Sequence, residues 1–158
     1  MATKRSSGIL LYRDRDGTTE FLLVHPGGPY WTRKDDGAWS IPKGGIEGEE
    51  DSRTAALREL DEELGPGRPE LDPDELIDLG QVRQRAGKVV DAWAAEGDFD
   101  PAALDSNTFE MEWPPRSGRE VPFPEVDRAD WFALEAARQK LLPAQGEFLD
   151  RLLEHLAG

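Results

Sequence analysis

Two short apolar runs near the N-terminus limit the folds open to this chain more than any other feature of its sequence. They cover residues 8–12 (Gly-Ile-Leu-Leu-Tyr) and residues 20–25 (Glu-Phe-Leu-Leu-Val-His), and the polar segment between them contains Asp16-Gly17. An Asp-Gly pair between two apolar runs is a strong signal for a tight β-hairpin turn. The sequence therefore predicts two neighbouring antiparallel strands.

Strand-like and helix-like segments alternate along the rest of the chain. The most regular of them is a helix that begins at Asp51 or Ser52 and ends at Gly65-Pro66-Gly67. The other predicted segments are a loop over residues 26–37, a short strand over 39–42 that ends at its proline, strands over 76–84, 88–96 and 128–132, an irregular acidic segment before the last of these, and an amphipathic helix over 144–156 whose apolar face carries Phe148, Leu149, Leu152, Leu153 and Leu156. This order indicates a single α/β domain over residues 1–158, with a mixed β-sheet and helices on both of its faces.

The composition narrows the classes of function. The 33 Asp and Glu residues outnumber the 19 Lys and Arg residues, which gives a formal net charge of −14 and argues against a protein that binds nucleic-acid duplexes. No apolar run approaches the roughly 18 residues of a membrane-spanning helix, and no signal peptide is recognisable, so we expect a soluble cytoplasmic protein without a membrane partner. Because Cys is absent, any metal would bind to oxygen or to one of the two histidines. Abundant carboxylates favour Mg²⁺, Mn²⁺ or Ca²⁺.

Three glutamates gather on one face of the helix predicted after Asp51. Glu59, Glu62 and Glu63 are spaced i, i+3 and i+4, which brings their carboxylates together. Like charges at this spacing cost about 0.2–0.5 kcal/mol per pair, which a solvated acidic helix tolerates. A functional site is favoured by three further features: the Gly44-Gly45 pair before the helix, Arg58 beside the first glutamate, and Glu50 at the helix entrance.

The segment from Gly44 to Gly65 resembles the signature of the Nudix hydrolases, G-x5-E-x7-R-E-U-x-E-E-x-G-U, in which U is a bulky apolar residue. The matching residues are Gly44, Glu50, Arg58, Glu59, Leu60, Glu62, Glu63 and Gly65. Pro66 departs from the pattern at the last apolar position, which is not a ligand position. The resemblance implies a Nudix-like α/β/α sandwich that hydrolyses a nucleoside diphosphate linked to another group, with the help of a divalent cation.

The resemblance also assigns a metal site. Glu59, Glu62 and Glu63 would hold Mg²⁺ or Mn²⁺, assisted by Glu50 and by the backbone of Gly44. A protein of charge −14 would repel an anionic diphosphate unless bound cations reversed the local field. Such cations polarise phosphoryl oxygens, neutralise the leaving group and lower the pKa of the attacking water.

Catalysis requires an orienting group and a general base as well. The resemblance makes Arg58 the orienting partner of the carboxylates. The base is open at this point: Glu62 or Glu63 is one choice, and Glu125, in the loop before the strand at residues 128–132, is another. The plain alternative for Glu125 is a solvated loop carboxylate.

Candidate substrate contacts are Lys43, Gly45, Arg83, Arg85 and Lys88. Pro42-Lys43-Gly44 is similar to the lead-in of diadenosine polyphosphate hydrolases, which favours dinucleoside polyphosphates or nucleoside triphosphates as substrates. The alternatives are an exposed loop lysine at position 43 and, further on, a basic cluster that balances neighbouring acids. The candidates for stacking a nucleobase are Tyr30, Trp31, Trp93 and Trp113.

Two other classes of function compete with the hydrolase. A Nudix-fold module could bind a nucleotide without cleaving it, but such a module has no need of a carboxylate set that repels its anionic ligand. A calcium-binding acidic protein is disfavoured because no Asp-x-Asp-x-Asp-Gly loop occurs. The oligomeric state is not determined by these patterns.

Overall fold

The predicted N-terminal hairpin is present and forms the middle of the main sheet. β1 (Arg5–Arg15) pairs antiparallel with β2 (Thr18–Pro26), and Tyr12 lies opposite Phe21. The turn residues Asp16 and Gly17 have φ angles of 53° and 83°. Positive φ at both central positions matches the right-handed twist of the flanking strands, which explains the use of Asp-Gly.

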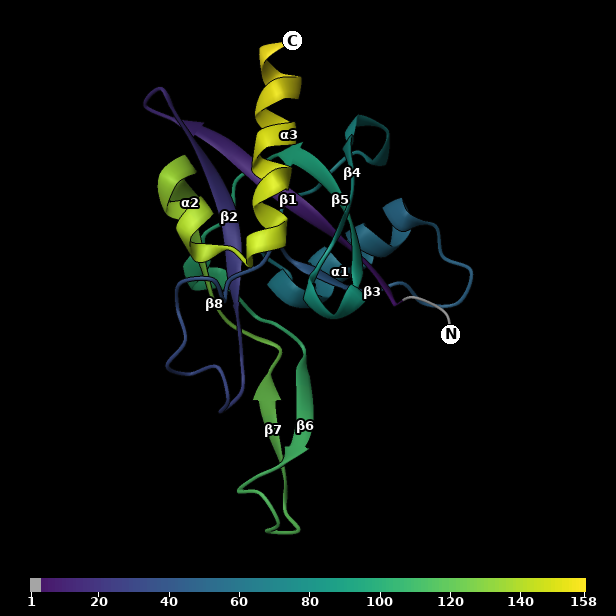
Figure 1. Cartoon of the computed structure of the whole chain (residues 1–158), viewed down its shortest axis with the longest axis vertical. Helices are drawn as coiled ribbons and strands as arrows, with labels where there is room; N and C mark the ends of the chain where they lie inside the picture. The colour runs from purple at the N-terminus through teal and green to yellow at the C-terminus, as the bar shows by residue number, and fades with distance from the viewer. Residues whose placement is uncertain (1–3) are drawn as a thin grey trace.

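The computed structural model describes residues 4–158 (Figure 1). The remaining helices and strands are β3 (Lys43–Gly45), α1 (Ser52–Leu64), β4 (Ile77–Arg83), β5 (Val89–Glu96), β6 (Thr108–Glu112), β7 (Glu120–Pro124), β8 (Val126–Ala133), α2 (Leu134–Lys140) and α3 (Gly146–Ala157). Short 3₁₀ turns are η1 (Pro73–Glu75), η2 (Arg85–Gly87), η3 (Pro101–Ala103) and η4 (Pro143–Gln145). The strands of the main sheet run in the order β4-β5-β1-β2-β8, and β3 pairs with β1. The β1–β5 pair is parallel and the others are antiparallel, so the predicted mixed sheet is confirmed.

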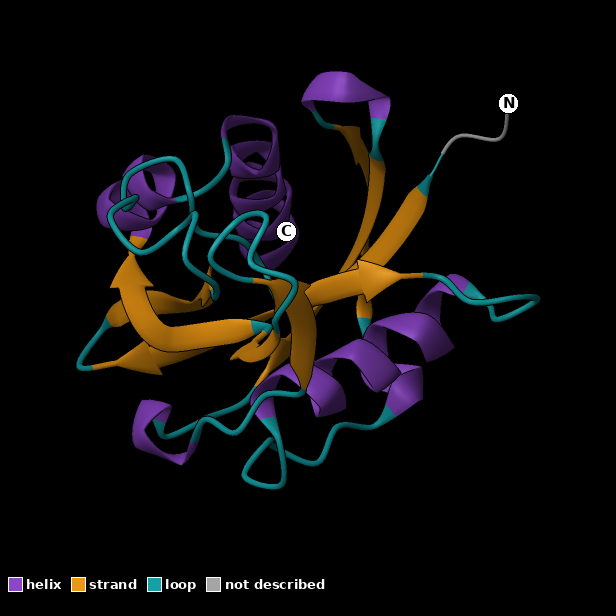
Figure 2. Cartoon of the chain, turned by 90° about the horizontal axis from the view of Figure 1, so that it is seen from below, coloured by secondary structure: helices purple, strands orange, loops and turns teal. Residues whose placement is uncertain are grey.

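Figure 2 shows helices on both sides of the main sheet, and the buried apolar side chains form two layers, one on each face. Alternation along β1 sends Ile9 and Leu11 into the layer that contains Leu60 of α1, and sends Leu10 into the layer that contains Phe148 of α3. All five side chains are fully buried, and each such burial is worth about 1.5–3 kcal/mol. Helices therefore cover both faces of the sheet, which confirms the predicted α/β/α sandwich.

Several predicted boundaries were wrong. Residues 39–42 form only isolated bridges, from Ser40 to Val24 and from Trp39 to Leu141, and the strand begins one residue after Pro42. The backbone of residues 43–45 pairs there with β1, which no side-chain pattern announced. Leu156 is 43% exposed, because α3 extends past the sheet that its other apolar residues cover.

Two elements were not predicted. α2 is a short helix with a single buried residue, Ala137, and so has almost no amphipathic signal. The acidic segment expected to be irregular contains the β6–β7 hairpin, which projects from the sandwich (Figure 1). This hairpin alternates half-buried and exposed residues on both strands and buries none of them fully.

Candidate active site

Helix α1 is held in place by caps that the sequence indicated. The carboxylate of Asp51 accepts a hydrogen bond from the backbone N–H of Thr54 at 2.8 Å, and the backbone N–H of Gly65 donates to the carbonyl of Asp61 at 2.9 Å. Gly65 has a φ of 86°, a conformation that favours glycine. Between these caps the helix packs one apolar face on the sheet and presents the neighbouring face to β3.

Two of the predicted glutamates lie directly against the backbone of β3. Glu59 is 6% exposed and Glu63 is 8% exposed. A Cβ atom on Gly44 would overlap the Glu59 carboxyl group, so only glycine allows this approach. An oxygen of Glu63 accepts a hydrogen bond from the backbone N–H of Lys43 at 3.3 Å. The Gly44-Gly45 pair thus makes room for carboxylates.

Arg58 connects the other members of the cluster. Its guanidinium donates to both oxygens of Glu50 at 2.8 Å, to Glu59 at 2.9 Å and to Glu62 at 3.1 Å. A further bond of 2.9 Å reaches the carbonyl of Gly45. A planar guanidinium with five donors is suited to such a set of acceptors. The structure brings together Glu50, Arg58, Glu59 and Glu62, as the signature predicts.

The pKa values divide the cluster into two kinds of carboxylate. Hydrogen bonds from Arg58 and from the backbone of Glu47 lower the pKa of Glu50 to about 2. Burial raises the pKa of Glu59, against the effect of Arg58 and together with the charge of Glu62. Burial and the charge of Glu59 raise the pKa of Glu63 well above its usual value. The two buried carboxylates therefore lack part of the positive charge that would balance them.

The chemistry of these donors fits a hard divalent cation, which carboxylate oxygens bind well. Across residues 4–158, however, no three acidic or histidine side chains converge on one point at metal-ligand spacing. The reason is visible in the geometry: Arg58 bonds to Glu50, Glu59 and Glu62 and draws their carboxylates toward its guanidinium.

Glu125 joins the site from the other side. It lies between β7 and β8, where its backbone N–H donates to Asn107 at 2.8 Å and its carbonyl accepts from Gly27 at 3.0 Å. Partial desolvation and the charge of Glu62 raise the pKa of the Glu125 carboxyl. A residue of the loop before β8 is thereby brought close to the glutamates of α1.

A pocket of about 320 Å³, here named the side chamber, opens next to Glu63 and Glu125. The other lining residues are Val24, Pro26, Trp31, Ala38, Ser40, Ile41, Lys43, Gln84, Lys88, Val126 and Leu142. One wall is apolar, Trp31 supplies an aromatic ring that is 37% exposed, and two lysines lie near the acidic end. This mixture suits a ligand with a flat apolar part and an anionic part.

The loop that carries Trp31 is anchored by His25, a residue left out of the predicted site. The buried imidazole bonds through Nδ1 to Asp127 at 2.7 Å and through Nε2 to the carbonyl of Lys34 at 2.6 Å. These bonds join the loop to β8 across the sheet edge. His25 does not line the side chamber, and it fixes the position of a loop that does.

A second hollow, of about 490 Å³, shares two lining residues with the side chamber and is here named the basic hollow. It is lined by Lys4, Arg5, Ser6, Lys43, Gly45, Ile46, Gly48 and Lys88. Lys43 and Lys88 border both spaces. Burial, together with the charge of Lys88, lowers the pKa of Lys43. Four cationic side chains thus surround one hollow in a chain whose net charge is −14.

The other predicted substrate contacts lie differently. Arg83 and Arg85 are exposed at the β4–β5 turn, where Arg83 donates to the carbonyl of Gly87 at 3.3 Å. Of the aromatic candidates, Trp93 bonds to Ser52 at 2.9 Å on the α1 side of the sheet, and Tyr30 packs edge-on against Trp113. Only Trp31 of these four aromatic residues lines the side chamber.

Gln84 lines the side chamber and was missed in the sequence. A single glutamine at the end of a strand belongs to no motif and to no periodic pattern. No local signal could have found it.

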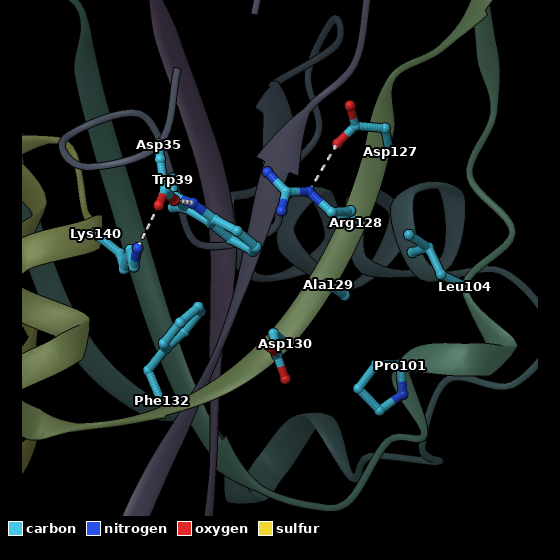
Figure 3. A pocket seen from close by; sticks show the side chains of 10 residues that line it. All are labelled: Asp35, Trp39, Pro101, Leu104, Asp127, Arg128, Ala129, Asp130, Phe132 and Lys140. Atoms are coloured by element: carbon cyan, nitrogen blue, oxygen red, sulfur yellow. Dashed lines mark hydrogen bonds and ion pairs between the residues drawn. The ribbon is translucent and has the colours of Figure 1, made fainter. Parts of the chain in front are cut away.

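A hollow of about 440 Å³ lies apart from this site, beside the edge strand β8 (Figure 3). It shares no lining residue with the side chamber or the basic hollow. Both of its cationic side chains lie in ion pairs, Lys140 with Asp35 at 2.5 Å and Arg128 with Asp127 at 4.0 Å.

Residues 2–152 match the family model of the NUDIX domain. The chain therefore belongs to the Nudix family, and the resemblance stated from the sequence is confirmed. Solved structures show the same fold: the *C. elegans* Ap4A hydrolase binary complex has a TM-score of 0.64 and 24% identity and covers 99% of each chain. The NUDIX domain of *Shewanella oneidensis* NrtR, complexed with ADP ribose, has a TM-score of 0.64 and 17% identity, with 99% of this chain and 90% of that chain covered.

Curated relatives are RNA pyrophosphohydrolases. The protein from *Agrobacterium fabrum* is 29% identical over 137 residues, which covers 76% of this chain and 74% of the relative. The protein from *Acidiphilium cryptum* is 58% identical over 33 residues, and that from *Dinoroseobacter shibae* is 71% identical over 28 residues. Those two matches span only 20% and 18% of the relatives' lengths. The relatives agree with the enzyme class that the signature predicts.

Among the described residues, no helix has the length and apolar character needed to span a membrane.

Proposed function

We propose that this protein is a metal-dependent Nudix pyrophosphohydrolase that cleaves the phosphoanhydride linkage of a nucleotide carrying an extended polyphosphate. The observation that supports it best is the carboxylate cluster on α1, which lies beside the aromatic side chamber and the basic hollow. Dinucleoside polyphosphates and nucleoside triphosphates both have the flat base and the chain of anionic groups that these two spaces suit. The C. elegans and Agrobacterium relatives act, by name, on substrates of this general kind.

Glu59, Glu62 and Glu63 would hold Mg²⁺ or Mn²⁺, with Glu50 and the Gly44 backbone in support. When bound there, the cation supplies charge neutralisation for the phosphates and a lowered pKa for the attacking water. The raised pKa of Glu59 and Glu63 supports this role, because a nearby cation would stabilise both carboxylates in their charged form.

The chain's own residues would do the remaining work. Lys43 and Lys88 bind phosphate oxygens where the side chamber meets the basic hollow. Trp31 stacks against the base. Glu125 accepts the proton of the attacking water, since its raised pKa brings it nearer to neutral pH and it takes no part in the Arg58 bonds. Hydrolysis at phosphorus then releases two phosphorylated products.

The deciding experiment measures product release from dinucleoside polyphosphates, nucleoside triphosphates, nucleotide sugars, coenzymes and RNA with a 5′-triphosphate. Each substrate is tested with Mg²⁺, with Mn²⁺ and with chelator. We expect metal-dependent cleavage of polyphosphate substrates. In the Glu125→Gln variant we expect kcat to fall at least tenfold. A rate within about threefold of wild type would reduce Glu125 to a loop carboxylate.

A second candidate is a Nudix-fold module that binds nucleotides without cleaving them. The bonds from Arg58 to Glu50, Glu59 and Glu62 favour it, because a side-chain cation already occupies three of the carboxylates that a metal ion would bind. Nucleotide binding without product release under every metal condition would establish this candidate in place of the hydrolase.

A further inference from the structure

A buried glutamine at the start of α3 has its amide orientation set by the backbone. Gln145 is fully buried, and its Oε1 accepts a hydrogen bond from the backbone N–H of Ile41 at 2.9 Å. A backbone N–H can only donate, so this atom of Gln145 must be the oxygen. The other end of the amide, Nε2, is therefore a donor at a known place.

The orientation of the Gln145 amide in turn fixes that of Gln84, a residue that lines the side chamber. Nε2 of Gln145 donates to Oγ of Ser40 at 3.0 Å and to Oε1 of Gln84 at 2.8 Å. If the Gln84 amide were turned around, its NH₂ group would face the NH₂ group of Gln145 with no acceptor between them. The oxygen of Gln84 is thus occupied, and the end of its side chain left for other partners is the donor Nε2.

Gln84 is well placed to use that donor on a ligand. It is half-buried, lines the side chamber together with Trp31 and Lys88, and is held at the end of β4 by its backbone N–H, which donates to the carbonyl of Lys88 at 2.7 Å. Nothing in residues 4–158 accepts a hydrogen bond from its Nε2. Gln84, with its amide oriented in this way, and the aromatic ring of Trp31 therefore line the same chamber.

We propose that Gln84 is a specificity-determining residue, which donates a hydrogen bond to an acceptor atom of the nucleobase, and that Gln145 is the positioning residue that prevents its amide from turning. The proposal rests on the function proposed above, in that the ligand of the side chamber is a nucleotide. A purine with a ring nitrogen at this position is accepted, and an analogue with a C–H group there is rejected. Selectivity of this kind arises because an unmatched polar group is costly to desolvate.

The test compares purine nucleoside diphosphates with their 1-deaza, 3-deaza and 7-deaza analogues, each of which replaces one ring nitrogen by a C–H group. Dissociation constants are measured in chelator for the wild type and for Gln84→Met. We expect one analogue to bind about tenfold more weakly than its parent to the wild type, and equally well to the variant. Gln145→Met should reduce the same ratio, because it frees the Gln84 amide to rotate.

Gln81→Met is the matched control. Gln81 lies on β4, its amide donates to Asp91 of β5 at 2.7 Å, and it does not line the side chamber, so the ratio should stay at its wild-type value. Equal ratios for every analogue in the wild type and in Gln84→Met would overturn the proposal, as would a wild type that binds none of the nucleotides. Because these measurements do not require turnover, a protein that binds selectively without hydrolysis would refute the proposed enzyme and leave this inference standing.

Discussion

The carboxylate cluster of α1 and the hollow beside β8 both contain several charged side chains, but they balance charge in opposite ways. In the β8 hollow, the ammonium of Lys140 bonds to Asp35 and lowers the pKa of that carboxyl (Figure 3). In the cluster, burial raises the pKa of Glu59 and Glu63, although Arg58 bonds to the first of them. One region satisfies its charges internally, and the other does not.

The difference separates a structural arrangement of charges from a functional one. Ion pairs on a surface stabilise themselves and need no ligand. Carboxylates that are buried with too little positive charge are unstable unless something else compensates, and such groups gather at functional sites. The crowded carboxylates of α1 are thus the better candidate for chemistry, although the β8 hollow has a volume of about 440 Å³.

The largest effect is expected from a substitution that neutralises one carboxylate of the α1 cluster. Glu62→Gln should lower kcat by two or more orders of magnitude while the fold is retained, because it removes one charged ligand of the proposed cation. Product release with Mg²⁺ and far-ultraviolet circular dichroism measure the two effects. Glu154→Gln, an exposed substitution on α3, is the control and should keep full activity. Unchanged turnover in Glu62→Gln would remove the metal-site assignment.

A smaller change tests the close approach of α1 to β3. Gly44→Ala places a methyl group where the Glu59 carboxylate lies, so either the side chain or the strand must move. We expect a loss of about 1–3 kcal/mol in unfolding free energy, together with a weaker response of the melting temperature to Mg²⁺. Urea unfolding checks the first value. In Gly45→Ala the added Cβ meets no atom within 4 Å, so this variant should keep its stability, and equal losses in both would contradict the argument.

A third test removes one cationic side chain from each of the two regions and compares the losses of stability. Arg58→Met leaves Glu50, Glu59 and Glu62 without their shared donor and should cost about 1–3 kcal/mol of unfolding free energy. Lys140→Met removes one of the two cationic side chains of the β8 hollow, whose ion pair with Asp35 is exposed, and should lower the melting temperature much less. Thermal unfolding of both variants in one buffer gives the comparison, and a larger effect from Lys140→Met would reverse our interpretation.

The smallest expected effect is a pH dependence of stability. The pKa of Glu63 is raised in the folded state, so the folded protein binds its proton more tightly than the unfolded chain does. Without metal, Glu63 should lower the unfolding free energy as pH rises from 4.5, the ordinary pKa of a glutamate, toward its higher pKa in the folded protein. Glu63→Gln should therefore be more stable than the wild type at pH 7 in chelator, and the difference should shrink at pH 4. Chemical unfolding at several pH values measures this, and a difference independent of pH would contradict it.

Glu50 should act in the opposite direction. Its pKa is lowered to about 2 by Arg58, so its stabilising contribution is complete above pH 4.5 and is lost as pH falls toward 2. The two kinds of carboxylate in one cluster thus affect stability in different pH ranges, Glu50 below pH 4.5 and Glu63 above it. In Glu50→Gln, the unfolding free energy should therefore decrease less steeply than in the wild type as pH falls below 4.5. Near neutral pH its dependence on pH should be the same in both proteins.

The sequence by itself determined the elements whose signals are local. The hairpin at Asp16-Gly17 depends on two backbone angles, and helix α1 depends on its caps at Asp51 and Gly65. The i, i+3, i+4 spacing placed three glutamates on one helix face, and the Nudix signature pointed to their partners. Turn geometry, capping and helical periodicity act over a few residues, so a linear pattern is sufficient to reveal them.

Only the tertiary structure decided which distant residues share the site. Glu125 lies near α1 because Asn107 links the two segments: its backbone N–H donates to the carbonyl of Glu62, and its carbonyl accepts from the N–H of Glu125. Lys88 lines the side chamber and Arg83 does not. The orientation of Gln84 depends on Gln145, which is 61 residues away. Such contacts arise from packing between elements. The orientation of one buried amide fixes which atom of the next amide must accept its hydrogen bond. No local pattern in the chain encodes either of them.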